Sequence, residues 1–171
     1  MAKTKKQAEL LKSFLSAAGD EQGALFSQIT GYLDELGYYP QKGKSSLSFK
    51  HDLHNKQIAK IGFKKAEEPG SFLALRFSAC KGYSQRFIDI VGAAIIKYPH
   101  RTPRCIDGGC SFCAGEPSTH IYTKTFPNLV SKSHCGAYAL EIPSLSAEDI
   151  GEIRELIKEE HAYLLEHEAR R

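Results

Sequence analysis

The sequence predicts an α+β protein whose sheet is antiparallel. Apolar residues recur at the spacing of an amphipathic helix in residues 5–36 and again in residues 146–164. Between them, residues 45–78 alternate between apolar and polar side chains, the pattern of strands with one buried face. The connections between these strands are short, which favours an antiparallel meander. Because helices and strands occur in separate runs, the fold class is α+β.

Two helices are expected near the N-terminus. The first covers residues 5–18 and stops at Gly19, and its apolar positions are Leu10, Leu11, Phe14 and Leu15. The second begins at Asp20, which can act as its N-cap, and ends at Gly37. The apolar face of this second helix comprises Leu25, Phe26, Ile29, Leu33 and Leu36.

Three consecutive strands follow. The stretches "SSLSFKHD", "QIAKIGFKK" and "SFLALRFS" have the residue types and alternation of strands, and Leu47 and Phe49 share one face of the first. The segment "AEEPG" lies between the second and third stretches and has the composition of a turn. These strands are predicted to form a three-stranded meander.

Further elements are expected after the meander. A third helix is predicted at residues 84–97, with Ser84 as its N-cap. The stretches "THIYTKTF" and "GAYALEIP" are predicted to be strands that flank a turn near Pro127. Ser146 and Asp149 resemble a capping box at the start of a last helix. The inward residues of that helix would be Ile150, Ile153, Ile157 and Leu164.

This order of elements resembles the small bacterial YdhG-like and YjbR-like domains. The resemblance covers residues 20–97 and 136–165 and includes the strand that ends "YALEIP". It implies a sheet with helices packed on one face, and it carries over no functional residue. Because residues 98–135 depart from the pattern, the chain is predicted to be a single domain, residues 1–171, with residues 98–135 as a cysteine-rich insertion.

Composition and charge are those of a globular protein. The chain has 171 residues, of which 42% are hydrophobic and 25% charged, and its net charge of +3 indicates no particular partner. A secretory signal needs an unbroken apolar run, and Glu9 and Lys12 interrupt the N-terminal segment. No apolar run is long enough to span a bilayer. We therefore expect a cytoplasmic protein without a membrane partner.

Four of the five cysteines form a constellation typical of metal sites. Cys105, Cys110 and Cys113 are spaced C-x4-C-x2-C, and Cys135 follows. Disulfides are rare in the cytoplasm, which leaves metal binding as the favoured interpretation. Four thiolates around zinc form a closed, structural site, and we predict that zinc organises the insertion. Cys80 is expected to be a small buried apolar residue.

An iron–sulfur cluster is the alternative. Residues 105–115, "CIDGGCSFCAG", resemble the cluster loop of plant-type ferredoxins, which has the same C-x4-C-x2-C spacing and a distant fourth cysteine. The resemblance implies a 2Fe–2S cluster held by the same four cysteines, and hence electron transfer or redox sensing. His120 and His134 are possible substitute ligands, but neither is included in the predicted set. Free thiols without a metal are the third possibility.

The remaining features indicate no catalytic site. No Ser-His-Asp order, phosphate loop or paired-acid motif is present, so the prediction is a binding or interaction module rather than an enzyme. Residues 42–65 contain seven lysines, which could bind nucleic acid or simply protect an exposed strand edge from aggregation. Nucleic-acid binding is therefore a weaker alternative. These lysines are Lys42, Lys44, Lys50, Lys56, Lys60, Lys64 and Lys65.

Overall fold

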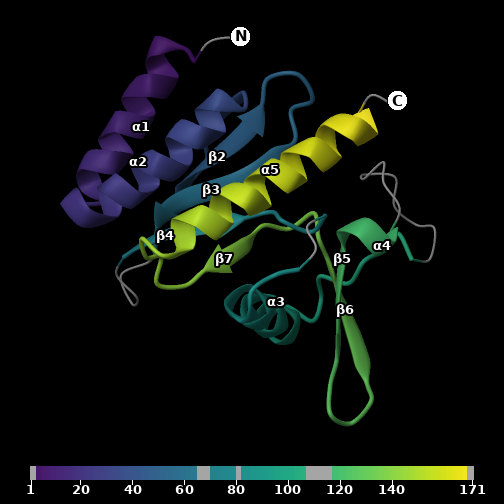
Figure 1. The fold of residues 1–171 in the computed structure, drawn as a ribbon. Helices are drawn as coiled ribbons and strands as arrows, with labels where there is room; N and C mark the ends of the chain where they lie inside the picture. The colour runs from purple at the N-terminus through teal and green to yellow at the C-terminus, as the bar shows by residue number, and fades with distance from the viewer. Residues whose placement is uncertain (1–2, 65–69, 80–81, 107–116, 169–171) are drawn as a thin grey trace.

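The fold is α+β, with three helices lying across one face of a five-stranded antiparallel sheet (Figure 1). The computed structural model describes residues 3–64, 70–79, 82–106 and 117–168. The helices on the sheet are α1 (Lys5–Ala17), α2 (Asp20–Glu35) and α5 (Asp149–Glu168). No helix in these described ranges is both long enough and apolar enough to cross a membrane.

The two N-terminal helices form where the sequence predicts them. Thr4 caps α1 in a reciprocal capping box with Gln7. The N-cap of α2 is Gly19 at φ 81°, so Asp20 is the first residue of the helix and not its cap. A left-handed backbone is cheapest at glycine, which explains how so short a connection turns the chain between the helices.

The main sheet contains the predicted meander and two additional strands. Its strand order is β1-β2-β3-β4-β7, and every neighbouring pair is antiparallel. The sequence analysis missed β1, because Pro40 interrupts the strand pattern; proline is tolerated here since β1 lies at the sheet edge. The strands are β1 (Tyr38–Lys42), β2 (Ser46–His51), β3 (Gln57–Phe63), β4 (Ser71–Leu75) and β7 (Leu140–Ile142).

The strand register divides the sheet into two chemically different faces. One transverse row joins four buried aliphatic residues, Leu47, Ile61, Leu73 and Ile142, which pack in the core with the helices. The adjacent row lies on the opposite face, because side chains alternate along a strand, and three of its four side chains are polar. Its members are Ser48, Lys60, Ala74 and Glu141.

A second, smaller unit lies beside the main sheet. It contains α3 (Gln85–Lys97), α4 (Pro117–His120), β5 (Ile121–Thr125) and β6 (Ser131–Cys135). The strands β5 and β6 form an antiparallel hairpin that projects away from the rest of the molecule (Figure 1). The two stretches predicted to flank the turn near Pro127 do contain strands, β5 and β7. However, the strand that directly follows this turn is β6, which was not predicted; β6 pairs with β5, while β7 joins β4 in the main sheet.

Candidate metal site at the base of the projecting hairpin

Only two of the four predicted metal ligands lie in the described part of the chain. Cys105 is half-buried in a turn after α3, and Cys135 is half-buried at the last position of β6. Cys110 and Cys113 lie outside the described residues, as does Cys80. Of the predicted zinc or iron–sulfur ligands, the structure therefore places only the first, Cys105, and the last, Cys135.

Backbone hydrogen bonds gather the segments that carry these residues. The amide of Cys135 donates to the carbonyl oxygen of Arg101 over 2.8 Å. The amide of Gly136 donates to the carbonyl oxygen of His120, also over 2.8 Å. Cys135 is directly opposite Ile121 in the hairpin, next to His120. The residues before Cys105, the start of β5 and the end of β6 thus meet at the base of the hairpin.

Cys105 lies beside His120 at this base. Its sulfur is 3.7 Å from Nε2 of the imidazole, and His120 is only 1% exposed. The other imidazole nitrogen, Nδ1, is 3.1 Å from the hydroxyl of Tyr163 on α5. Thr119 donates a hydrogen bond to that hydroxyl over 3.4 Å. The imidazole is therefore oriented by a helix that is distant in sequence, a relationship that the sequence analysis did not detect.

The described residues supply a pair of potential ligands and not a complete site. Within the described ranges, no three His, Cys, Asp or Glu side chains are arranged to hold a metal ion. A sulfur and an imidazole nitrogen are nonetheless the ligand types that structural zinc sites use. A complete site would need further ligands in addition to Cys105 and His120.

His134 has a different environment from His120. It is 1% exposed, and its Nδ1 lies 3.0 Å from the carbonyl oxygen of Cys135. Its ring contacts those of Tyr122 and Tyr138, and its Nε2 has no hydrogen-bond partner among the described residues. Burial lowers the pKa of His134. This side chain is consequently a buried neutral imidazole between aromatic rings.

The basic residues near the cysteines occupy separate positions. Arg101 stacks between Tyr98 and Tyr138, with its guanidinium carbon 3.8 Å and 4.9 Å from the two ring centres. Lys124 and Lys132 are opposite each other on the hairpin, nearer its tip. Both lysines therefore lie away from the base of the hairpin, where Cys135 is opposite Ile121.

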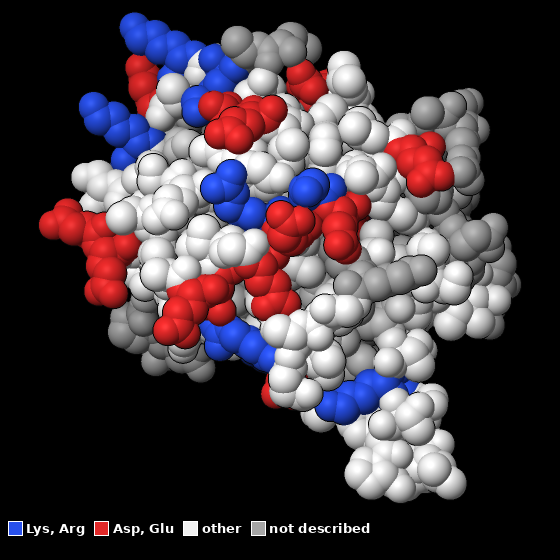
Figure 2. Space-filling model, viewed as in Figure 1, with Lys and Arg blue, Asp and Glu red and all other residues white. Residues whose placement is uncertain are grey.

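The tip of the hairpin exposes apolar side chains. Leu129 is 86% exposed and has a φ of 61°, and Val130 is 48% exposed. Residues 117–140 contain no Asp or Glu. In Figure 2 the projecting hairpin is white with a blue patch and no red. The tip thus combines exposed aliphatic side chains with nearby lysines.

The lysine-rich strands place two lysines on the polar face of the sheet. Lys50 is opposite Tyr39, and Lys60 is opposite Ser48. Both lysines are half-buried, whereas Lys42 and Lys44 are exposed near the β1–β2 turn. Lys64 forms an ion pair of 2.9 Å with Glu141, and Lys65 lies outside the described residues.

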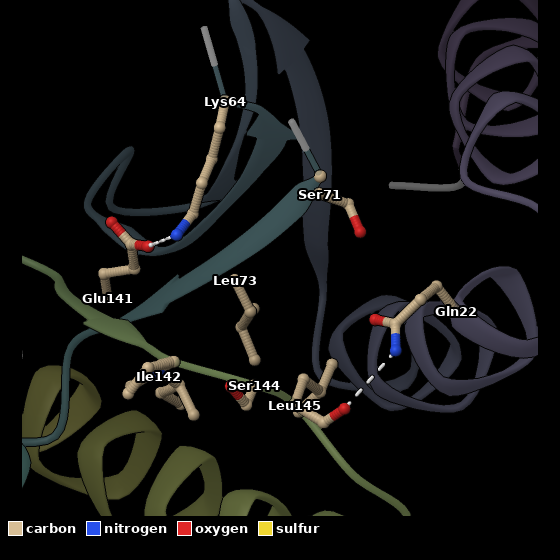
Figure 3. A pocket seen from close by; sticks show the side chains of 10 residues that line it. Gln22, Lys64, Ser71, Leu73, Glu141, Ile142, Ser144 and Leu145 are labelled. Carbon is tan, nitrogen blue, oxygen red and sulfur yellow. Dashed lines mark hydrogen bonds and ion pairs between the residues drawn. The ribbon is translucent and has the colours of Figure 1, made fainter. Parts of the chain in front are cut away.

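A hollow of about 290 Å³ lies between α2 and the β4–β7 edge of the sheet (Figure 3). The Lys64–Glu141 ion pair forms one wall, and the amide of Gln22 donates to the carbonyl oxygen of Leu145 on another. Ligand pockets commonly reach about 300–1,000 Å³ and enclose most of the ligand. This hollow is small, and two of its polar pairs are already formed within the protein.

A buried ion pair joins the main sheet to α5. Glu160 is completely buried, and its carboxylate accepts hydrogen bonds from Arg76 Nε and, over 2.9 Å, from the amide of Ala79. Burial raises the pKa of Tyr122, and the negative charge of Glu160 raises it further. The sequence analysis missed this pair because its members are far apart in the chain.

Comparison of the chain with protein-family models, with curated proteins and with solved structures finds no match.

Proposed function

We propose that this protein is a binding module in which a structural zinc ion secures the base of a projecting hairpin. The candidate sulfur ligands are Cys105, Cys110, Cys113 and Cys135. The observation that carries the proposal is the contact between Cys105 and the buried His120, 3.7 Å apart, where the two hairpin strands begin and end. The hairpin then carries the contact surface for a partner.

Zinc is favoured over an iron–sulfur cluster by the chemistry of this contact. The resemblance to the plant-type ferredoxin loop implies ligation by cysteine alone, whereas Cys105 has an imidazole as its neighbour. Structural zinc sites commonly mix thiolate and imidazole ligands, and they contribute directly to folding. A closed zinc site would supply stability that a segment with few apolar residues cannot obtain from apolar burial alone.

The hairpin tip supports a binding role because its backbone adopts a costly conformation at an exposed residue. A left-handed backbone costs a residue with a side chain about 1–2 kcal/mol, and Leu129 adopts it at φ 61°. The same side chain is 86% exposed, so burial in this chain does not offset the cost. Strain retained at an exposed apolar position is a physical reason to expect a contact with another molecule.

Hydrogen exchange after zinc removal tests the structural part of the proposal. We expect the amides of Cys135 and Gly136 to lose protection from exchange when a chelator removes zinc. They donate to the carbonyl oxygens of Arg101 and His120, and these hydrogen bonds lie at the hairpin base that zinc would hold together. The amides of β2 and β3 serve as the internal control and should remain protected. Cys105→Ser should reproduce the chelated pattern without a chelator. Unchanged protection at the hairpin base would refute the zinc-stabilised module.

Partner capture with matched variants tests the binding part. Leu129→Gly and Lys132→Glu alter the tip, whereas Lys12→Glu alters an exposed lysine on α1. Molecules cross-linked by the unmodified chain should be lost with both tip variants and retained with Lys12→Glu. If all four proteins capture the same molecules, the hairpin tip is not the contact surface.

Single-stranded nucleic acid is a second candidate partner, favoured by the strand register of the polar sheet face. Lys50 lies directly opposite Tyr39, so a cation and an aromatic ring are adjacent on that face. Single-strand binding surfaces combine phosphate-binding cations with aromatic rings that stack on bases.

A salt titration with a labelled single-stranded oligonucleotide decides this second candidate. The logarithm of the affinity should fall linearly with the logarithm of the salt concentration, by about 0.7 per phosphate neutralised. Replacing Lys50 and Lys60 with glutamate should reduce that slope by about 1.4. Lys12→Glu is the control. No measurable binding at low salt, or an unchanged slope, would exclude this role for the sheet face.

A further inference from the structure

We infer that His120 is itself a ligand of the zinc ion, so the site contains nitrogen as well as sulfur. The inference rests on the proposed zinc site and assigns one of its positions to a residue outside the four-cysteine set. Cys105 and His120 would occupy two neighbouring corners of the coordination tetrahedron. Three of the four cysteines would then be sufficient to complete the site.

The distance between the two side chains fits this geometry. With Zn–S bonds of about 2.3 Å and Zn–N bonds of about 2.0–2.1 Å, neighbouring sulfur and nitrogen ligands of a tetrahedral ion are about 3.5–3.6 Å apart. Cys105 Sγ and His120 Nε2 are 3.7 Å apart. The observed separation therefore exceeds that of two ligands of one tetrahedral zinc ion by only about 0.1–0.2 Å.

Nδ1 of His120 has the hydrogen-bond partner that a histidine bound to a metal through Nε2 usually has. When Nδ1 carries the proton, it donates to the Tyr163 hydroxyl over 3.1 Å, and Nε2, which faces the Cys105 sulfur, carries the lone pair that would coordinate the ion. Upon binding, the Cys105 thiol loses its proton and His120 remains neutral. Tyr163 thus acts as a positioning residue that fixes both the tautomer and the ring orientation.

The backbone of His120 is fixed at the same place. Its carbonyl oxygen accepts a hydrogen bond of 2.8 Å from the amide of Gly136, and its side chain is 1% exposed. His134 is equally buried, but its Nδ1 faces the carbonyl of Cys135 and its ring packs on Tyr122 and Tyr138. Among the described residues, His120 is the histidine of the hairpin base whose ring nitrogen faces a cysteine sulfur.

This assignment has a consequence for the whole molecule. Tyr163 belongs to α5, which packs on the main sheet, while His120 ends α4 and leads into β5. A zinc ion bound by His120 would connect the hairpin base to α5 through the Tyr163 hydrogen bond. The orientation of the hairpin relative to the sheet would then depend on the metal.

X-ray absorption at the zinc edge of the full chain, purified without a metal-affinity tag, tests the inference. We expect about one nitrogen at about 2.0–2.1 Å and about three sulfurs at about 2.3 Å around each zinc. His120→Asn should abolish the nitrogen shell. Tyr163→Phe should weaken zinc binding by about 10–100-fold, the usual effect of losing the group that orients a ligand. His100→Asn, at an exposed histidine, should change neither quantity.

The possible results separate this inference from the proposal on which it rests. Zinc surrounded by four sulfurs would overturn the assignment of His120 and leave the structural zinc site intact. A chain that binds no zinc would overturn both. A mixed shell that persists in His120→Asn would also overturn the assignment, because the nitrogen would then come from another residue.

Discussion

Gly136 donates its amide hydrogen to the carbonyl oxygen of His120, and a methyl group on Gly136 would overlap with that same oxygen. The methyl group would also overlap with Cβ of Ser78 at the end of the main sheet. The close approach of three backbone segments therefore requires a residue without a side chain at position 136. This contact fixes where the hairpin base meets the sheet.

Gly136→Ala should separate the hairpin base from the main sheet. We expect a loss of about 3 kcal/mol in the free energy of unfolding, the upper end of the usual cost of overpacking, because rigid backbone cannot move aside cheaply. Urea unfolding measures this loss. The control is Gly151→Ala in α5, where a methyl group meets no atom within 4 Å and should stabilise the helix by up to about 1 kcal/mol. Equal effects of the two substitutions would contradict the account of the hairpin base.

Glu160→Gln should destabilise the protein strongly because it removes the negative charge that pairs with the buried guanidinium of Arg76. Arg76 is 3% exposed and Glu160 is completely buried. Breaking such a pair typically costs about 3–5 kcal/mol. Glu155→Gln is the matched control on the same helix, because its pair with Lys158 is exposed and should contribute less than about 1 kcal/mol. Similar unfolding midpoints for both variants would show that the buried pair is dispensable.

The stability of the protein should decrease as the pH falls below about 6.5, in part because of His161. Burial lowers the pKa of His161, and the nearby His51 lowers it further. Its Nδ1 lies 3.2 Å from the hydroxyl of Tyr38, whose own pKa is raised by burial and by the charge of Glu160. The unfolded chain therefore binds a proton at His161 before the folded chain does, and this favours unfolding in acid.

Unfolding measured between pH 7.5 and 5 checks this behaviour. The slope of the unfolding free energy against pH measures how many protons the chain takes up on unfolding. His161→Gln should lower this number by up to one. The glutamine amide can still form a hydrogen bond with the Tyr38 hydroxyl. His100→Asn, at an exposed histidine, is the matched control variant. An unaltered slope in His161→Gln would mean that this histidine titrates equally in the folded and unfolded states.

Leu129→Gly should stabilise the isolated protein. Relief of the left-handed backbone at φ 61° should stabilise the folded state by about 1–2 kcal/mol. The greater freedom of glycine in the unfolded chain opposes this gain and costs about 0.4–1 kcal/mol. The expected net gain therefore lies between about zero and about 1.6 kcal/mol. Leu129→Ala keeps the backbone cost and should change the stability little. A loss of stability in the glycine variant would indicate that Leu129 makes a favourable contact within the chain.

The sequence predicted the elements whose signals are local. The helices at Lys5–Ala17 and Gln85–Lys97 and the three-stranded meander were confirmed, because each buries a face whose periodicity is visible in the sequence. The strand that pairs with β5 was missed. The true partner, "SKSHC", lies in a hairpin that projects from the body, so most of it buries no apolar face and shows no apolar alternation.

The candidate site was predictable only in its cysteine spacing. The sequence indicated Cys105 and Cys135 as ligands, but it favoured neither His120 nor His134. The contact between His120 and Tyr163 joins residues 43 positions apart, and no local pattern encodes it. Arg76 and Glu160 are likewise paired through the packing of α5 on the sheet. Such pairings follow from the tertiary fold and could not be derived before it.

Elemental analysis of the full chain, purified without a metal-affinity tag and without oxygen, tests the central claim most directly. The account predicts about one zinc per chain, no visible absorption band, and loss of the zinc in Cys105→Ser. Protein without bound metal would contradict the claim that a metal secures the hairpin base. Iron with sulfide and a visible absorption band would also contradict it, and would indicate an electron-transfer or redox-sensing protein instead.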